Sequence, residues 1–545
     1  MTNRKLITHH ASRITLFAIL LLLIARCGPS PTPIPTVEPT STPTVVPPPT
    51  PKPTLNPTPT TAPQPTLPPP TAVAPTPVAG WDDLTLYKAA MLPQFADDVA
   101  QLDDPTQYHI DLVVDMETLT LRGSQRLLYT NNETVELSEI YFRLFPNTPD
   151  HGGRMSVERI IVNRQEPAVT YELSDTAMRV LLAEPLAPEA QLEILVDFKV
   201  VVPEGNQHGY GAFNHENGIM ALAGFYPLVP VYDDEGWNVE LAADYGDVVY
   251  SDTALYNLHL TVPEDMVVVT SGSIVSEAED NDGTRTLHCV SGPMRDFDVV
   301  ISWDFVVKST SVGQTTVNSY YLPMDEAAGE RVLQYISDAL RAYNERFGLY
   351  PFAEFDVVEV PITAAGIEYP GLIVIAQRFY EEGQEGGFFE FATAHEVAHQ
   401  WWYSMVGSDQ VDEPWLDEAL TNYSTLIYVE DIHGQREAQS ILARYFEGPY
   451  RQVVEKGRDA VVAQPVAAFS EEDYSPIVYG KGPLFFHALR QEVGDETYFA
   501  IMREYLRQHK YKIATPESFM RVAESVSGRD LDAIYKQWIL GTKRP

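Results

Sequence analysis

The chain has 545 residues, enough for two or three domains, with 44% hydrophobic content and a formal net charge of −39 at pH 7. Such an acidic surface would repel nucleic acid and anionic lipid headgroups, so nucleic acid is excluded as a partner. The acidic excess is interpreted as a source of solubility outside the cell or in salt, with an electrostatic attraction for cationic peptides as the alternative.

Residues 1–26 are predicted to be a signal peptide or a signal anchor. Arg4, Lys5 and Arg13 precede an apolar run over residues 14–25. Twelve helical residues span about 18 Å, well short of a hydrocarbon core of about 30 Å. A stable transmembrane helix is therefore not expected.

Cys27 follows this leader. Residues 24–27, Ile-Ala-Arg-Cys, resemble a bacterial lipobox, in which the cysteine is acylated and becomes the new amino terminus. The lipobox has a small residue before the cysteine whereas this chain has Arg26, so an uncleaved signal anchor is the alternative to a lipoprotein. In both cases the protein is predicted to be exported and tethered to the outer face of the membrane. Cys289 is expected to be a small core residue without a disulfide.

Residues 27–80 are predicted to be a disordered linker. The stretch is almost wholly Pro, Thr, Ala and Val, and only Glu38 and Lys52 are charged between Gly28 and Gly80. It cannot bury enough apolar surface to fold, and proline stiffens it toward polyproline II. At about 3.1 Å per residue it could reach on the order of 160 Å when extended. Its expected role is to hold the folded part away from the membrane.

Residues 81–315 are predicted to form a β-rich domain. Apolar and polar residues alternate along residues 108–114 and 192–198, as they do in half-buried strands. Similar runs occur at residues 256–262 and 298–303. Turn residues separate these runs.

Residues 316–545 are predicted to form a mainly helical domain, because the apolar period changes. Its first helix is predicted from residues spaced three or four apart, which are Val332, Ile336, Leu340, Tyr343 and Phe347. Gly348 is placed to end this helix. Two short apolar strands, residues 355–360 and 372–376, flank the loop that contains Glu368.

A His-Glu-Val-Ala-His motif at residues 395–399, with eighteen residues between it and Glu418, predicts a metal site. Residues four apart in a helix share a face, so His395 and His399 can present two imidazoles to one Zn²⁺. Glu418 completes a three-ligand site that leaves a position open for water, so one zinc ion per chain is predicted. Glu396 lies beside the first ligand and can take a proton from that water. Two core histidines bonded to backbone are the alternative.

This pattern resembles the gluzincin aminopeptidases related to aminopeptidase N and leukotriene A4 hydrolase. Their glutamate ligand lies in a W-L-x-E context, matched here by residues 415–418, and thermolysin-type endopeptidases have one more residue in the interval. The resemblance implies a multidomain α+β fold: an antiparallel β saddle domain, then a mainly helical thermolysin-like zinc peptidase domain. It also implies a short form without the C-terminal helical domain. Asp417 is either an acceptor for a ligand imidazole or a solvated carboxylate at a helix start.

The loop at residues 365–371, Ala-Gly-Ile-Glu-Tyr-Pro-Gly, resembles the family's G-x-M-E-N loop. Ile367 stands for its Met and Tyr369 for its Asn. The resemblance makes Gly366 and Glu368 substrate-binding residues, with Glu368 bound to the free amino terminus of the substrate. A solvated loop glutamate is the alternative.

Tyr479, within Val-Tyr-Gly-Lys-Gly at residues 478–482, resembles the tyrosine with which the family stabilises the oxyanion. Tyr474 is a weaker candidate, and a core aromatic residue is the alternative. Many relatives have a second acidic or amide anchor in the β domain. Glu216 and Asn217 are nearby without a convincing match.

The predicted function is a cell-surface zinc metallopeptidase, most simply an aminopeptidase that releases N-terminal residues from peptides through a zinc-bound water. A buried carboxylate at Glu368 would pair with a substrate ammonium, so peptides with a free amino terminus are the expected substrates. An endopeptidase or epoxide hydrolase-like activity on the same scaffold is one alternative. A non-catalytic surface binding protein is another, which loss of a ligand, of Glu396 or of Tyr479 would favour, and none is lost.

Overall fold

The computed structural model describes residues 80–149, 151–205, 209–241, 243, 245–246, 249–381 and 387–542. The chain divides into two compact units, residues 1–76 and 77–545, and every described residue belongs to the second. The predicted signal, Cys27 and all but the last residue of the predicted linker lie outside the described residues. Within the described ranges, no helix is long and apolar enough to cross a bilayer.

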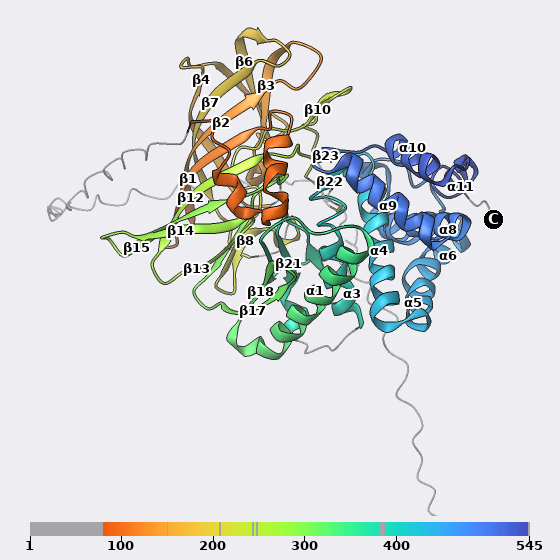
Figure 1. The fold of residues 1–545 in the computed structure, drawn as a ribbon. Helices are drawn as coiled ribbons and strands as arrows, with labels where there is room; N and C mark the ends of the chain where they lie inside the picture. The colour runs from red at the N-terminus through yellow and green to blue at the C-terminus, as the bar shows by residue number, and fades with distance from the viewer. Residues whose placement is uncertain are drawn as a thin grey trace, which may run out of the picture. The chain divides into compact units, whose positions relative to one another are not determined.

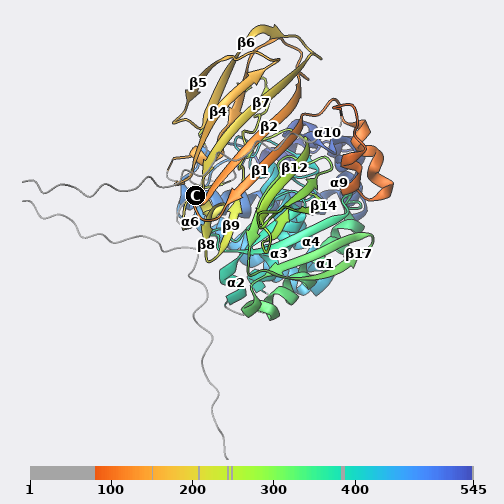
Figure 2. The same ribbon diagram turned by 90° about the vertical axis from the view of Figure 1, so that its left-hand side faces the viewer.

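The first part of the second unit is built from β-sheets (Figures 1 and 2). Its largest sheet has seven strands, in the order β14 (Ser273–Glu279), β15 (Thr284–Val290), β12 (Leu255–Pro263), β1 (Gln107–Asp115), β2 (Thr120–Thr130), β7 (Gln191–Val201) and β4 (Arg154–Val162). All neighbours pair antiparallel except β1 and β12, which are parallel. Buried and exposed residues alternate along β1 and β7, as the period of two predicted.

Smaller sheets complete this β-rich part. One has the order β3 (Leu137–Arg143), β6 (Ala177–Leu186) and β5 (Ala168–Glu172), and another β13 (Val267–Thr270), β16 (Val299–Ser302), β9 (Ile219–Leu222) and β8 (Phe213–Glu216). A two-stranded ribbon joins β10 (Tyr232–Asp233) to β11 (Gly236–Trp237). The four strands predicted around residues 108, 192, 256 and 298 are confirmed as β1, β7, β12 and β16.

A five-stranded sheet begins the second part, in the order β17 (Val306–Val312), β18 (Thr315–Tyr321), β19 (Glu354–Val360), β21 (Leu372–Ala376) and β20 (Gly366–Ile367). The strands predicted at residues 355–360 and 372–376 are confirmed as β19 and β21, which pair in parallel. β17 and β18 pair across the predicted domain boundary at residues 315–316. The boundary itself stays a prediction.

Helices form most of the remaining chain. They are α1 (Glu326–Arg346), α2 (Gln377–Glu381), α3 (Gly387–Ala398), α4 (Trp415–His433), α5 (Gln435–Ile441), α6 (Gly448–Glu455), α7 (Glu471–Ser475), α8 (Gly482–Val493), α9 (Asp495–His509), α10 (Pro516–Ser527) and α11 (Asp532–Trp538), with π-helical turns η6 (Leu442–Glu447) and η8 (Pro476–Lys481). The predicted first helix is confirmed as α1, and Gly348 follows its end with φ +138°. A β-rich part followed by a mainly helical part confirms the predicted α+β class.

Helices α3 and α4, which carry the candidate site residues, are buried on all sides over most of their length. Every residue from Phe389 to Ala398 and from Trp415 to Val429 is buried. A helix without a solvent face normally carries apolar residues all round. These two carry histidines and carboxylates as well, and buried polar groups need partners.

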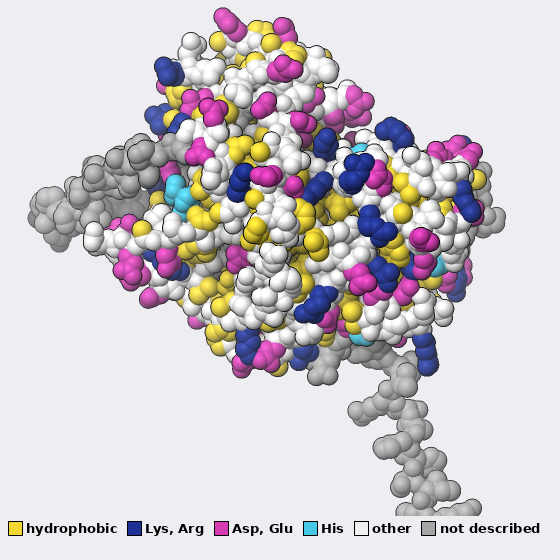
Figure 3. All heavy atoms as spheres, viewed as in Figure 1, with side chains coloured by type: hydrophobic (Ala, Val, Ile, Leu, Met, Phe, Trp, Pro, Cys, Tyr) yellow, Lys and Arg dark blue, Asp and Glu magenta, His cyan; other side chains and the backbone are white. Residues whose placement is uncertain are grey.

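Acidic side chains are spread over both parts of the molecule. On the face shown in Figure 3, Asp and Glu lie over the sheets and over the helices rather than in one patch. The distribution agrees with the sequence, in which nearly all of the net charge of −39 lies outside the linker.

Candidate active site

The three predicted zinc ligands meet between α3 and α4. His395 lies in the last turn of α3, and His399 follows its final residue, with an N–H that donates to the His395 carbonyl at 3.4 Å. Glu418 lies in the first turn of α4, which packs against α3. All three side chains are buried, with exposed fractions of 9%, 0% and 3%.

Their ligating atoms form a small triangle. Nε2 of His395 lies 3.2 Å from Nε2 of His399 and 3.2 Å from Oε2 of Glu418, and the third side is 3.6 Å. Ligand atoms bound tetrahedrally to zinc at about 2.0–2.2 Å lie roughly 3.3–3.6 Å apart. Oε2 of Glu418 is buried and accepts no hydrogen bond from the described residues. The geometry and the nitrogen and oxygen donors therefore fit zinc.

Asp417 fixes the orientation of one ligand. Its Oδ1 lies 2.8 Å from Nδ1 of His399, and its other oxygen accepts a hydrogen bond from the Gln410 amide. Donation from Nδ1 leaves the Nε2 lone pair of His399 directed at the triangle. Asp417 is only 2% exposed, so it is an imidazole acceptor and the solvated-carboxylate alternative is wrong.

Several carboxyl groups are buried in the site, and the pKa values of Glu396 and Glu368 show that nearby protein cations do not compensate their charge. Burial raises the pKa of Glu396 well above its ordinary value, and the nearby Glu368 charge adds to this. Burial also raises the pKa of Glu368 to about 7, against the opposing effect of His399. Burial would raise the pKa of Glu418 too, but His399 and His395 hold it well below its ordinary value. A dication at the triangle would favour the ionised carboxylates.

Gly366 gives Glu396 the space it occupies. A Cβ atom at Gly366 would lie 2.5 Å from both Cγ and Oε1 of Glu396, so no other residue fits without moving that carboxylate. Gly366 belongs to β20, the edge strand of its sheet. The resemblance assigned Gly366 to substrate binding, and the structure adds a steric reason for glycine.

Glu368 lies beside the ligand cluster. It is 8% exposed, which rules out the solvated-loop alternative. One of its oxygens lies within 4.8 Å of ligating atoms of His399 and Asp417. Among the described residues, no Lys or Arg is among the main influences on its pKa.

Tyr479 lies on η8, with its ring centroid 6.0 Å from that of His395. Asn422, one turn after Glu418 on α4, donates to the Tyr479 carbonyl at 2.9 Å. Tyr474 is buried on α7 and packs against Tyr479 at 5.8 Å. Tyr479 is therefore the tyrosine in ring contact with a ligand imidazole.

The residues that follow Tyr479 hold η8 in place. Lys481 is buried, pairs with Asp459 at 3.0 Å and donates to the carbonyl of Gly541. A Cβ atom at Gly482 would lie 2.5 Å from that of Ala419, the residue after Glu418. Gly482 therefore permits close packing of this segment on α4.

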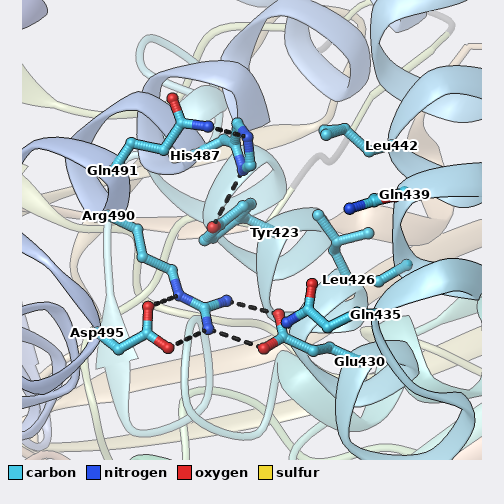
Figure 4. Close-up of a pocket in the computed structure, with 11 residues that line it drawn as sticks. Tyr423, Leu426, Glu430, Gln435, Gln439, Leu442, His487, Arg490, Gln491 and Asp495 are labelled. Atoms are coloured by element: carbon cyan, nitrogen blue, oxygen red, sulfur yellow. Dashed lines mark hydrogen bonds and ion pairs between the residues drawn. The ribbon is translucent and has the colours of Figure 1, made fainter.

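A surface pocket lies away from the ligand triangle. A cavity of about 190 Å³ lies between α4, α5 and α8, and none of the predicted site residues lines it (Figure 4). The Arg490 guanidinium there donates to both Glu430 and Asp495. Its charge is neutralised within the protein.

Comparison with known proteins agrees with this geometry. Residues 332–538 match the model of the peptidase family M1 domain. The predicted resemblance to the gluzincin aminopeptidases is confirmed for this part of the chain. Aminopeptidase M1-C of Oryza sativa subsp. japonica is 24% identical over 303 residues, which cover 52% of this chain and 34% of the relative. Aminopeptidase M1-A of the same plant is 21% identical over 481 residues, which cover 82% of this chain and 51% of the relative.

The chain spans about a third to a half of the length of these curated M1 relatives. A solved M1 zinc metallopeptidase from Deinococcus radiodurans superposes with a TM-score of 0.60 at 19% identity. The alignment covers 81% of this chain and 95% of that one, so the two chains share a fold.

Several residues that support this site were not predicted. Gln410 and Thr421 contact Asp417 and His399, and Asn422 holds the Tyr479 backbone. No local sequence pattern indicates these residues, because each forms its contact with a segment that only the fold brings close. Asn217, weighed as a second anchor, donates to the Gln377 side chain at 2.8 Å.

Proposed function

We propose that the protein is a zinc aminopeptidase that removes N-terminal residues from peptides. The observation that carries this proposal is the 3.2–3.6 Å triangle of His395, His399 and Glu418 with Glu396 and Glu368 in the same buried space. The match of residues 332–538 to the peptidase family M1 domain and the fold shared with a solved M1 zinc metallopeptidase support zinc as the metal. One ligand triangle with nitrogen and oxygen donors supports one ion per chain.

Zinc at this triangle would supply a Lewis acid and a water of lowered pKa. Glu396 would take a proton from water in the site and return it to the leaving amine. Tyr479 donates a hydrogen bond to the oxyanion.

Glu368 selects the end of the peptide. A buried carboxylate without a protein cation gains most from a substrate ammonium, which forms a charge-assisted hydrogen bond in a site of low dielectric constant. A solved relative from Deinococcus radiodurans is described with a bound Tyr-Ser-Ala substrate, which supports peptides as the substrate class. Acetylated peptides would leave Glu368 without its partner.

The test uses purified protein and one pair of short peptides, free and N-acetylated at the same residue. We expect stoichiometric zinc, cleavage of the free peptide alone, loss of cleavage with a chelator and recovery with zinc. Equal cleavage of both peptides would favour the endopeptidase alternative. Stoichiometric zinc without cleavage of any peptide or aminoacyl-fluorophore would favour a binding protein.

We also propose export and membrane tethering through the N-terminal segment. The support is the charged and apolar leader and the lipobox-like residues 24–27. Mass spectrometry of the membrane-bound protein checks this, because lipoprotein processing cleaves off residues 1–26 and adds lipid to Cys27. An intact residue 1–26 segment would support the signal anchor instead.

A further inference from the structure

Gln400 connects the segment after the second ligand histidine to the segment after Glu368. It is fully buried, with an exposed fraction of 0%. Its Nε2 donates to the carbonyl of Tyr369 at 3.1 Å, and its Oε1 accepts the N–H of Gly371 at 2.9 Å. One side-chain amide thus makes two hydrogen bonds across 29 and 31 positions of sequence.

The segment that Gln400 holds is a tight turn. Leu372 N–H donates to the Tyr369 carbonyl at 3.1 Å, and Gly371 has φ +74°. Proline at the second position and a left-handed glycine at the third are typical of a type II turn. Glu368 immediately precedes this turn, so the position of the turn sets the position of the carboxylate.

The other end of the connection is equally fixed. Gln400 follows His399 directly, its own N–H donates to the carbonyl of Val397 at 3.1 Å, and its carbonyl accepts from Met405 at 3.3 Å. The buried Trp401 and Trp402 follow it. The amide therefore ties the Glu368 turn to the backbone that carries a ligand imidazole.

We propose that Gln400 is a positioning residue that sets the distance between the Glu368 carboxylate and the ligand triangle. This inference rests on the proposed function, because it assumes that Glu368 binds the substrate ammonium. Without the amide, the buried Gly371 N–H loses the acceptor that the described residues give it, while the Tyr369 carbonyl keeps Leu372 as a donor. The glycine end of the turn is then free to shift. A misplacement of about 1 Å can cost on the order of 100-fold.

The test measures binding rather than turnover. Glu396→Gln protein, which leaves the peptide uncut, is titrated with a short peptide and with its N-acetylated twin. Gln400→Met, which conserves size and removes the amide, is added to that background. We expect Kd for the free peptide to rise roughly 10- to 100-fold, with Kd for the acetylated peptide and the zinc content unchanged.

Gln125→Met is the matched control. Gln125 is also 0% exposed, and its amide donates to Pro227 in the β-rich part. Its replacement removes a buried amide of the same size and should leave both Kd values unchanged. If Gln400→Met does not fold, Gly371→Ala strains the same turn through its positive φ and should give the same selective loss.

A double mutant decides whether Gln400 acts through Glu368. In a Glu368→Gln background, Gln400→Met should no longer weaken binding of the free peptide, because the two effects share one path. An undiminished effect there, or an equal rise in Kd for both peptides, would overturn the role of Gln400. Equal Kd values for the two peptides without the Gln400 change would instead overturn the role of Glu368.

Discussion

Two clusters of buried ionisable groups lie near Tyr369, and they neutralise their charges differently. In one, Arg295 donates to the backbone carbonyls of Tyr403, Ser251 and Lys512, and Tyr403 donates to Asp296. In the ligand cluster between α3 and α4, two imidazole nitrogens and the Glu418 Oε2 atom converge on a shared space, and Oε2 accepts no hydrogen bond from the described residues.

Asp298 completes the first cluster. One of its oxygens accepts the N–H of Gly224, and the remaining oxygens, Asp296 Oδ1 and Asp298 Oδ2, accept no N–H or O–H from the described residues. The two carboxyls are close enough to hydrogen-bond to each other. One proton shared between the two carboxyls would give both oxygens a partner.

This difference distinguishes a buried charged cluster that stabilises the fold from one that serves catalysis. Both clusters are buried and both have perturbed pKa values, so neither property marks an active site alone. In the Arg295 cluster, protein donors and one proton satisfy the buried polar atoms. In the ligand cluster, the converging atoms are satisfied only when a cation is added. Its members should therefore affect chemistry and metal content, and those of the Arg295 cluster should affect folding.

The largest effect should come from Glu396→Gln. An amide cannot take the proton, so kcat should fall by roughly 10²- to 10⁴-fold. Zinc content, measured by metal analysis, should stay at the wild-type level, because Glu396 is no ligand. His399→Ala is the matched control and should lose the metal. Wild-type turnover by Glu396→Gln would remove the assignment of the general base.

Tyr479→Phe should come next. It removes one hydroxyl donor and keeps the ring that packs at 6.0 Å from His395. Loss of one oxyanion donor typically lowers kcat by about 10²- to 10³-fold. Tyr474→Phe, in the neighbouring ring, should change kcat much less. Comparable losses for both variants would show that the two hydroxyls act together.

The ligand triangle could be predicted from the sequence because its geometry is local. His395 and His399 are one helical turn apart, and the spacing to Glu418 belongs to a pattern that relatives share. Gln400 and Gln410 could not be predicted, since their partners are set by how separate segments pack. The sequence also offered no signal for η8, the π-helical turn that carries Tyr479.

Asp417→Asn tests the support of the ligand cluster. The amide can donate to His399 as readily as accept from it, so the imidazole tautomer is no longer enforced. Such losses typically weaken metal binding by about 10- to 100-fold. Competition with a chelator of known affinity measures this change. Unaltered zinc affinity would show that the contacts of His399 with Thr421 and the Trp402 carbonyl suffice.

The smallest effect should come from Asp298→Asn in the self-contained cluster, and it should appear in stability rather than activity. Burial, together with the Asp296 charge, raises the pKa of Asp298 well above its ordinary value, and burial raises that of Asp296 to about 6. Unfolded aspartates titrate near about 3.9. Between these values the folded state holds more protons than the unfolded state. The free energy of unfolding therefore falls as pH rises from about 4 through 6 and beyond.

Asparagine supplies an N–H donor that does not titrate, so Asp298→Asn should flatten this decline. Denaturant unfolding of the zinc-loaded proteins between pH 4 and 8 measures the two slopes. Other buried carboxyls contribute equally to both proteins, and their effect cancels in the difference. Asp234→Asn, at an exposed position, is the control and should parallel the wild type. If Asp298→Asn also ran parallel to the wild type, the two carboxyls would not share a proton, and the contrast between the clusters would fail.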